Sequence, residues 1–314
     1  MNMLNNMLTM VTPLPNNAPR SYDIEADWIL MSTCNFRCQY CYWDSVELGR
    51  KINPPAKVEQ LASFFDRSGL IWLLHLTGGE PFHYPRFVEL CQLLTQRHRI
   101  SINSNVDATQ HIQAFVEAID PARVDFINAG VHVEQRQAHK RTEVFVRNIQ
   151  LLQSAGFPVF VSCVMYPPLF GYFPTLWDWY ASRDIFLIPK VLQGKHFGRA
   201  YPWAYTEEER NLFVEYSKLA LAAYAEQFAS RDEPPSINPL MDHLAFLHGL
   251  GDYRGQLCYA GHSFVRIREN GDIRRCGAGD VLGNVVEGWF ERNPGPSPCR
   301  EVECPYFCEK YRVR

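Results

Sequence analysis

The sequence is organised around one short stretch, Cys34-Asn35-Phe36-Arg37-Cys38-Gln39-Tyr40-Cys41. Its three cysteines are spaced so that the thiolates of one loop can converge on a soft metal centre, either zinc or an iron–sulfur cluster. A closed cluster or a structural zinc site takes four protein ligands, whereas this loop supplies three. If no distant residue supplies a fourth ligand, one metal position is left open for chemistry.

The spacing alone leaves three interpretations open: a structural zinc site with a distant fourth ligand, a disulfide framework, and an iron–sulfur cluster with one open iron. A disulfide framework is not favoured in a chain of 314 residues with this composition. Context separates the other two. The cysteine stretch follows an apolar strand-like run directly, and Gly78-Gly79-Glu80-Pro81 follows a second such run.

In combination, these two motifs resemble the radical SAM superfamily. The resemblance implies that Cys34, Cys38 and Cys41 hold three irons of a catalytic [4Fe–4S] cluster, and that the fourth iron chelates S-adenosylmethionine (SAM). It also implies that one electron splits SAM into methionine and a 5′-deoxyadenosyl radical, which takes hydrogen from a substrate carbon. The expected electron donor is a flavodoxin- or ferredoxin-type protein.

The resemblance assigns further cofactor-binding roles. Tyr40 is expected to flank the adenine, and Gly78-Gly79-Glu80 to clamp the methionine amino group, where missing side chains let the backbone approach the ligand. Asn103-Ser104-Asn105 are candidates for ribose and carboxylate contacts; the alternative is an ordinary polar loop after a strand.

The composition limits the possible partners and the cellular location of the protein. A hydrophobic content of 46% supports a large core, and a net charge of −3 with dispersed basic residues does not favour a nucleic-acid partner. Residues 1–22 predict a flexible N-terminal segment, without an apolar run long enough for a signal peptide or a membrane span. We therefore expect a cytoplasmic protein without a membrane partner, in which ten cysteines indicate metal binding rather than disulfides.

The next 178 residues alternate between strands and helices, which predicts an α/β fold. Apolar runs predict strands at 26–32, 70–76, 99–104, 123–131, 159–165 and 185–192, with helices between them. This pattern indicates a partial (β/α)6 TIM-like barrel over residues 23–200. Both motifs and Asn103 then fall at the carboxyl ends of strands, where barrels place their chemistry. Pro189 predicts that the sixth strand lies at an edge.

Residues 201–256 predict a helical connector. A helix over 206–229 begins at a capping box formed by Thr206 and Glu209. A short apolar helix is expected over 240–249. The packed stripe of the long helix is predicted at Leu212, Tyr216, Leu219 and Ala223.

A second cysteine cluster occupies residues 257–314, where an Asn270-Gly271 turn predicts a β-hairpin that brings Cys258 and Cys276 close together. This segment resembles the twitch or SPASM extension of radical SAM enzymes. The resemblance implies a small β-hairpin/α iron–sulfur domain with one auxiliary [4Fe–4S] cluster. Its expected ligands are Cys258, Cys276, Cys304 and Cys308, with Cys299 as an alternate. A treble-clef-like structural zinc site is the alternative.

Several single residues have two interpretations each. Cys163, in the fifth strand, could return a hydrogen atom to a substrate radical if it points into the barrel; otherwise it is a small core residue, as we expect for Cys91. His132 and Lys190 either touch substrate or are satisfied polar residues at the barrel rim.

The predicted function is that of a radical SAM oxidoreductase or epimerase. We expect dehydrogenation or epimerisation of a small molecule of the sugar or cyclitol type in natural-product biosynthesis. The alternatives are a ribosomal-peptide maturase and a non-catalytic, metal-stabilised binding module. The small-molecule prediction rests on the first strand beginning after about 25 residues, fewer than the leader-binding domain of many peptide-modifying relatives needs.

Overall fold

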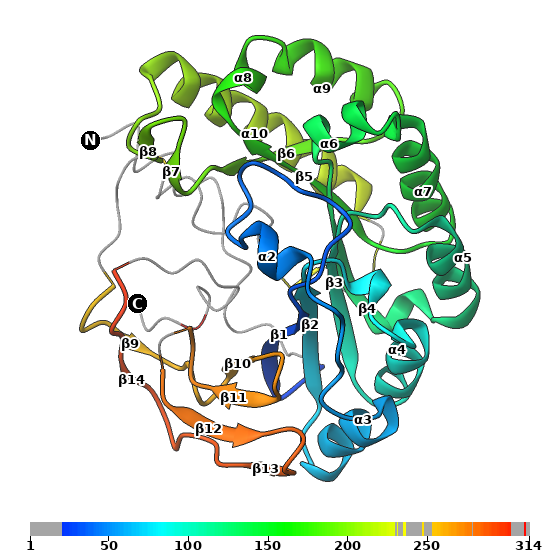
Figure 1. The fold of residues 1–314 in the computed structure, drawn as a ribbon, viewed down its shortest axis with the longest axis vertical. Coiled ribbons are helices and arrows are strands. Elements are labelled where there is room, and N and C mark those ends of the chain that lie inside the picture. Colours follow the sequence, from blue (N-terminus) through cyan, green and yellow to red (C-terminus); the bar gives the residue numbers. More distant parts are fainter. Residues whose placement is uncertain are drawn as a thin grey trace.

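A computed structural model describes residues 21–229, 231, 235–236, 247, 253–277, 279–302 and 311. Its centre is a parallel sheet of six strands that lie side by side in chain order (Figure 1). The strands are β1 (Ile24–Met31), β2 (Trp72–Gly78), β3 (Arg99–Ser104), β4 (Val124–Gly130), β5 (Val159–Met165) and β6 (Leu187–Val191). The predicted α/β fold of the partial-barrel type is thus confirmed, and β6, which contains Pro189, ends the sheet as expected.

Helices connect successive strands, and most of them cover one face of the sheet, whereas the short α2 (Ser45–Leu48) lies apart from them within the curve of the sheet (Figure 1). The others are α3 (Val58–Arg67), α4 (Phe87–Thr95), α5 (Thr109–Ala118), α6 (Val133–Ala138), α7 (Thr142–Ser154), α8 (Pro167–Phe170) and α9 (Phe173–Ala181), with short 3₁₀ turns η1 (Pro81–His83) and η2 (Pro121–Arg123). Alternate strand residues such as Ala26, Leu74 and Ile102 pack against these helices in the main core. We refer to the opposite side of the sheet as its inner face.

Helix α10 (Glu207–Gln227) closes part of the inner face. Its Ala220 and Tyr224 pack against Phe126, Phe160 and Ile188, near the amino ends of β4, β5 and β6. The predicted capping box of Thr206 and Glu209 is present.

The predicted stripe of α10 is wrong by one position. The buried residues are Phe213, Ser217, Ala220 and Tyr224, whereas Leu219 is 44% exposed. Apolar residues occur on more than one side of this helix, so the 3.6-residue period was visible in the sequence but the side that faces the core was not. Contacts with the central sheet decide which side is buried.

The C-terminal strands extend the same sheet. Strand β10 (Phe264–Ile267) pairs in parallel with β1, and β11 (Asp272–Arg274), β12 (Val281–Asn284) and β13 (Trp289–Phe290) follow antiparallel. The predicted hairpin is confirmed, with Ile267 opposite Ile273 across the Asn270-Gly271 turn. Residues 23–200 and 257–314 therefore share one sheet, and their division into two domains stays a prediction.

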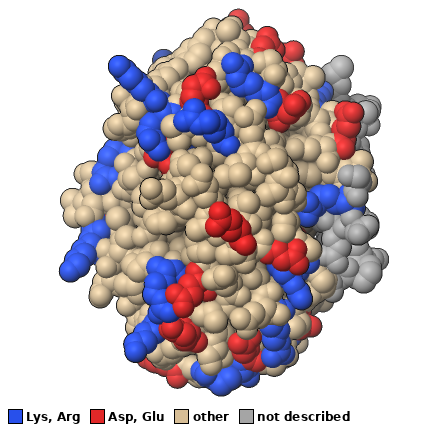
Figure 2. Space-filling model, turned by 90° about the vertical axis from the view of Figure 1, so that its right-hand side faces the viewer, with Lys and Arg blue, Asp and Glu red and all other residues tan. Residues whose placement is uncertain are grey.

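Two small antiparallel sheets of two strands each complete the described strands: β7 (Gly194–His196) with β8 (Arg199–Tyr201), and β9 (Leu257–Cys258) with β14 (Ser297–Pro298). Charged side chains of both signs are intermingled on the face drawn in Figure 2. In the described part of the chain, each helix is too short or too polar to cross a membrane. The predicted helix at 240–249, except Leu247, lies outside the described residues, as do Cys304, Cys308 and residues 1–20.

Candidate functional site

The cysteine loop leaves the carboxyl end of β1 and is tied to the segment around α2. The Cys34 N–H donates to the Leu48 carbonyl (3.1 Å), and Thr33 Oγ1 donates to the Arg50 carbonyl (2.6 Å). Burial raises the pKa of Cys34 to about 11 and that of Cys38 to about 12; the other thiols of the loop add to both shifts. The three thiol groups are therefore close enough for the charge on one to raise the pKa of another. Among the described residues, no His, Cys, Asp or Glu side chains form a closed metal-ligand group of three or more.

The surroundings of the sulfurs fit thiolate ligands. The Phe36 N–H lies 3.4 Å from Cys34 Sγ, and Asn105 Nδ2 lies 3.8 Å from the same sulfur. His132 Nδ1 lies 3.3 Å from Cys38 Sγ. Donors directed at sulfur stabilise a thiolate, and such contacts orient and tune the ligands of metal sites. The loop can thus supply three thiolates to an iron–sulfur cluster.

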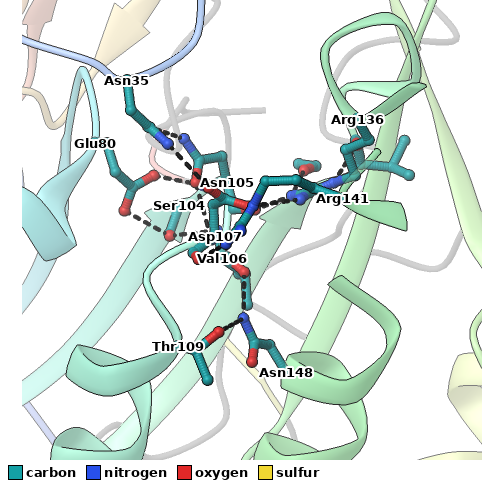
Figure 3. Close-up of polar contacts among 12 residues, drawn as sticks. Asn35, Glu80, Ser104, Asn105, Val106, Asp107, Thr109, Arg136, Arg141 and Asn148 are labelled. Carbon is teal, nitrogen blue, oxygen red and sulfur yellow. Dashed lines mark hydrogen bonds and ion pairs between the residues drawn. The ribbon is translucent and has the colours of Figure 1, made fainter. Parts of the chain in front are cut away.

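Side chains from the loop after β3 hold the cysteine loop in place (Figure 3). Asn35 accepts a hydrogen bond from Asn105 Nδ2 (2.7 Å) and donates to Asp107 Oδ2 (3.2 Å). Val106, between them, has a φ of 56°, unusual for a β-branched residue; its carbonyl accepts from Asn148 Nδ2 of α7 (3.0 Å). The strained backbone is held by this contact and directs Asn105 and Asp107 toward Asn35.

Two arginines complete this network. Asp107 Oδ1 lies 2.6 Å from Arg141 Nε and 3.4 Å from Arg136 Nη1. The Arg136 side chain is almost fully buried; its Nε donates to the Val131 carbonyl (2.7 Å), and its guanidinium lies 4.0 Å from the centre of the Phe145 ring. Burial lowers the pKa of Arg136 to about 10. Sequence reasoning missed Asp107 and both arginines, because nothing in their local pattern distinguishes them from surface charges.

Glu80 faces the same network instead of the inner face. Its fully buried carboxylate accepts from Ser104 Oγ (2.8 Å), from the Asn105 N–H (2.7 Å) and from the Phe82 N–H (3.0 Å). Burial raises the pKa of Glu80 to about 7, against the opposing effect of these donors. Ser104 and Asn105 are thus held by Glu80 and Asn35. Of the three predicted residues, only Asn103 lies on the inner face of the sheet.

The two glycines before Glu80 allow close contact between the ends of β1 and β2. The Gly79 N–H donates to the Met31 carbonyl (2.7 Å), and the Glu80 N–H donates to the Thr33 carbonyl (2.9 Å). A Cβ on Gly79 would lie 2.0 Å from Thr33 O, and Gly78 has a φ of 141°. Backbone packing alone therefore requires glycine here; the role of these glycines in binding the methionine group stays a prediction.

Replacing Gly79 by alanine is expected to destabilise the protein by about 3 kcal/mol, because the new methyl group meets backbone carbonyls that cannot rotate away. Urea unfolding would measure the loss. Gly171→Ala is the matched control, since a Cβ there has nothing within 4 Å. Equal stability of the two variants would contradict the expectation.

A row of hydrogen-bonded polar side chains crosses the inner face one level below the cysteine loop. Asn128 Nδ2 donates to Asn103 Oδ1 (2.7 Å), and Asn103 Nδ2 donates to Thr77 Oγ1 (3.3 Å). Asn103 is exposed, so this row remains accessible to a ligand. Deeper on the same face, Asp27 of β1 pairs with Arg266 of β10 (3.5 Å). The C-terminal segment thus contributes a charge to the inner face.

The other predicted residues have clear positions. The Tyr40 ring stacks on His132 (centroids 6.2 Å apart) and contacts Tyr166 (5.4 Å), so two aromatic side chains already cover it; its adenine contact stays a prediction. Cys163 belongs to the helix-facing core, so the condition for its role as a hydrogen donor, a thiol on the inner face, is not met. Cys91 is a fully buried core residue, as expected.

Lys190 is half-buried. Its side chain lies on the inner face of β6, since Leu187 and Val191 of the same strand face the helices. Its contact with substrate stays a prediction. His132 lies in the cysteine loop's immediate surroundings instead of the open part of the inner face.

A buried arginine joins the three described cysteine segments of the C-terminal region. Arg275, next to Cys276, donates through Nε to the Ala260 carbonyl (3.3 Å) and through Nη2 to the Ser297 carbonyl (2.8 Å). The Cys299 N–H donates to the Gln256 carbonyl (2.8 Å), beside Cys258. Arg275 therefore links the segments that carry Cys258, Cys276 and Cys299, which no sequence pattern indicated.

Comparisons with known proteins agree with this geometry. Residues 28–173 match the family model of the Radical SAM superfamily. No curated protein sequence matches the chain significantly. Among solved structures, Streptococcus suis SuiB bound to precursor peptide SuiA is similar, with 12% identity and a TM-score of 0.52 over 92% of this chain and 69% of that one. The structure of anSMEcpe with bound AdoMet is also similar, with 15% identity and a TM-score of 0.54 over 84% of this chain and 75% of that one. At these identities the likeness shows a shared fold.

Proposed function

We propose that this chain, whose residues 28–173 match the Radical SAM family model, is a radical SAM enzyme that cleaves SAM reductively and removes hydrogen from a substrate carbon. The family implies SAM and a [4Fe–4S] cluster as cofactors. The observation that carries the proposal is the cysteine loop at the carboxyl end of β1, held by side chains from the loop after β3 and from α6. Barrels place their chemistry at this end of the strands.

Cys34, Cys38 and Cys41 are the proposed cluster ligands. The cluster that they would hold would supply one-electron reduction of the sulfonium of SAM. The chain holds the loop through the hydrogen bond from Asn35 to Asp107, so the backbone that carries the three cysteines is anchored to the loop after β3. Glu80 orders the backbone after β3 through the Asn105 N–H, while the pairing of β3 with β4 sets Asn103 beside Asn128 on the inner face.

The proposed substrate is a small polar molecule, of the sugar or cyclitol type, that undergoes dehydrogenation or epimerisation. The accessible row Thr77, Asn103 and Asn128 supports this proposal, because amide and hydroxyl groups match the hydroxyls of such a ligand. Since Cys163 faces the helices, epimerisation at this site would need another hydrogen donor.

A peptide is the second candidate substrate. Two of the similar structures, SuiB with SuiA and anSMEcpe with the Cp18Cys peptide, contain bound peptides. A side chain presented by a peptide could reach the same row of amides. A panel of polyols and aminocyclitols compared with short peptides would separate the two classes by which compound accelerates cleavage of SAM.

An auxiliary [4Fe–4S] cluster at Cys258 and Cys276, completed by two of Cys299, Cys304 and Cys308, is also proposed. The support is Arg275, which draws three cysteine segments together. The described residues on either side of 303–310 are held near Cys258 as well: the Tyr253 N–H donates to the Val302 carbonyl (3.1 Å), and the Tyr259 N–H donates to the Tyr311 carbonyl (3.0 Å).

Anaerobic reconstitution tests the proposed function. With iron, sulfide, dithionite and SAM, the protein is expected to bind about eight irons and release 5′-deoxyadenosine. The variant Cys34→Ala/Cys38→Ala/Cys41→Ala should bind about four irons and release none, whereas Cys91→Ala should behave like the unaltered chain. Zinc at the loop, or a full iron complement without 5′-deoxyadenosine, would contradict the proposal; the latter result would indicate a binding module.

A further inference from the structure

His132, between β4 and α6, adopts a conformation that needs an explanation. It has a φ of 43°, in the left-handed region that costs a non-glycine residue about 1 kcal/mol or more. Although it stands at the N-cap of α6, its side chain makes no capping hydrogen bond. The imidazole therefore has another role at this position.

Gly130 provides the space for this ring. A Cβ built on Gly130 would lie 2.3 Å from His132 Nε2 and within 3.0 Å of two ring carbons. The φ of Gly130 is not in the left-handed region, so backbone conformation does not require glycine there. The missing side chain allows the imidazole to fold back over β4, which turns Nδ1 toward the cysteine loop.

Nδ1 of His132 faces two residues of that loop. It lies 3.3 Å from Cys38 Sγ and 3.2 Å from the Tyr40 hydroxyl, while the ring stacks on Tyr40 and meets the edge of Phe36 (centroids 5.8 Å apart, planes at 80°). One turn along α6, Gln135 fixes the loop backbone: its Oε1 accepts from the Arg37 N–H (3.0 Å), and its Nε2 donates to the Arg37 carbonyl (3.1 Å). Helix α6 thus holds the loop at Phe36, Arg37, Cys38 and Tyr40.

We propose that His132 is a positioning residue of the cluster site, whose Nδ1–H donates to the Cys38 thiolate and raises the reduction potential of the cluster. This inference rests on the proposed role of Cys38 as an iron ligand. A thiolate accepts hydrogen bonds but cannot donate them, so this hydrogen bond requires the tautomer of His132 that carries its proton on Nδ1, 3.3 Å from Cys38 Sγ. A donor at sulfur withdraws electron density and favours the reduced cluster. Gly130 and the strained backbone of His132 maintain this geometry.

Two variants of His132 separate the hydrogen bond from packing. His132→Phe keeps an aromatic ring against Tyr40 but has no donor. His132→Asn loses the ring but places an amide N–H near the position of Nδ1, and asparagine tolerates the left-handed backbone better than most residues. Urea unfolding of each variant without metal shows whether the fold is intact.

The main readout is the midpoint potential of the cluster whose EPR signal changes when SAM is added, measured together with iron and sulfide content. We expect His132→Phe to shift this potential to a lower value and to lower the rate of SAM cleavage at a fixed, weak reductant by about 10-fold or more. His132→Asn is expected to recover most of both losses. Gly130→Ala should resemble His132→Phe, because its methyl group displaces the ring, and Gly130→Ala/His132→Asn should resemble His132→Asn.

An unchanged potential in His132→Phe, with the cluster assembled, would overturn the inference and leave the proposed function intact. If His132→Phe binds no iron, His132→Asn decides: a restored cluster with the original potential supports the hydrogen bond, and continued loss refutes it. If the unaltered chain itself binds no cluster, the proposed function fails first, which is a separate result.

Discussion

Replacing Asp107 by asparagine is expected to lower the free energy of unfolding by about 3–5 kcal/mol, because it leaves the buried charge of Arg136 without its carboxylate. The amide keeps the shape of the side chain but not its charge. Arg136 cannot reach water from its position beneath Phe36 and beside Phe145. Urea unfolding of the protein without metal measures the loss. The same variant should load less iron, since Asn35 loses a charged acceptor.

The matched control is Asp66→Asn. Asp66 also pairs with a basic residue, His98 (3.2 Å), but its side chain is 50% exposed. Water can replace that pair, so the expected cost is below about 1 kcal/mol. If Asp107→Asn costs no more than Asp66→Asn, the network of Figure 3 does not stabilise the fold as described.

The second prediction with a large effect concerns Glu80 and pH. Burial raises the pKa of Glu80 in the folded protein from its ordinary 4.5 to about 7, so between these values the folded state holds a proton that the unfolded state has released. The protonated carboxyl makes its full contribution to the free energy of unfolding below pH 4.5, and this contribution is lost as the pH rises from 4.5 through 7. The decrease amounts to about 3 kcal/mol.

Comparing the unaltered chain with Glu80→Gln isolates this contribution. Urea unfolding between pH 5 and 7 should show stability falling less steeply with pH in the variant. Glu80→Gln should also be less stable overall at pH 5, because its amide nitrogen meets the Asn105 N–H or the Ser104 hydroxyl. Glu59→Gln, an exposed position paired with Arg86, should keep the original pH dependence. Parallel curves for the Glu80→Gln variant and the unaltered chain would refute the assigned cause.

Much of the fold was predictable because the positions of strands and helices along the chain depend on local patterns. The strand at 159–165 and the capping box at Thr206 were predicted at their observed positions, and Pro189 correctly placed β6 at the edge. The phase of α10 was not predictable, since its contacts with Phe126 and Phe160 come from distant strands. For the same reason, the pairing of β10 with β1 could not be read from either segment alone.

The sequence by itself determined the chemistry available to this protein: three closely spaced thiols, glycines where two strands end, and six parallel strands. These follow from spacing and periodicity, which are local properties. Only the tertiary structure decided how that chemistry is held. Asp107 and His132 follow β3 and β4, and Arg136 lies in α6; all three are far from Cys34–Cys41 in the chain, and they meet it because parallel strands bring their carboxyl ends to one edge. Contacts between such loops depend on long-range geometry, which no local pattern encodes.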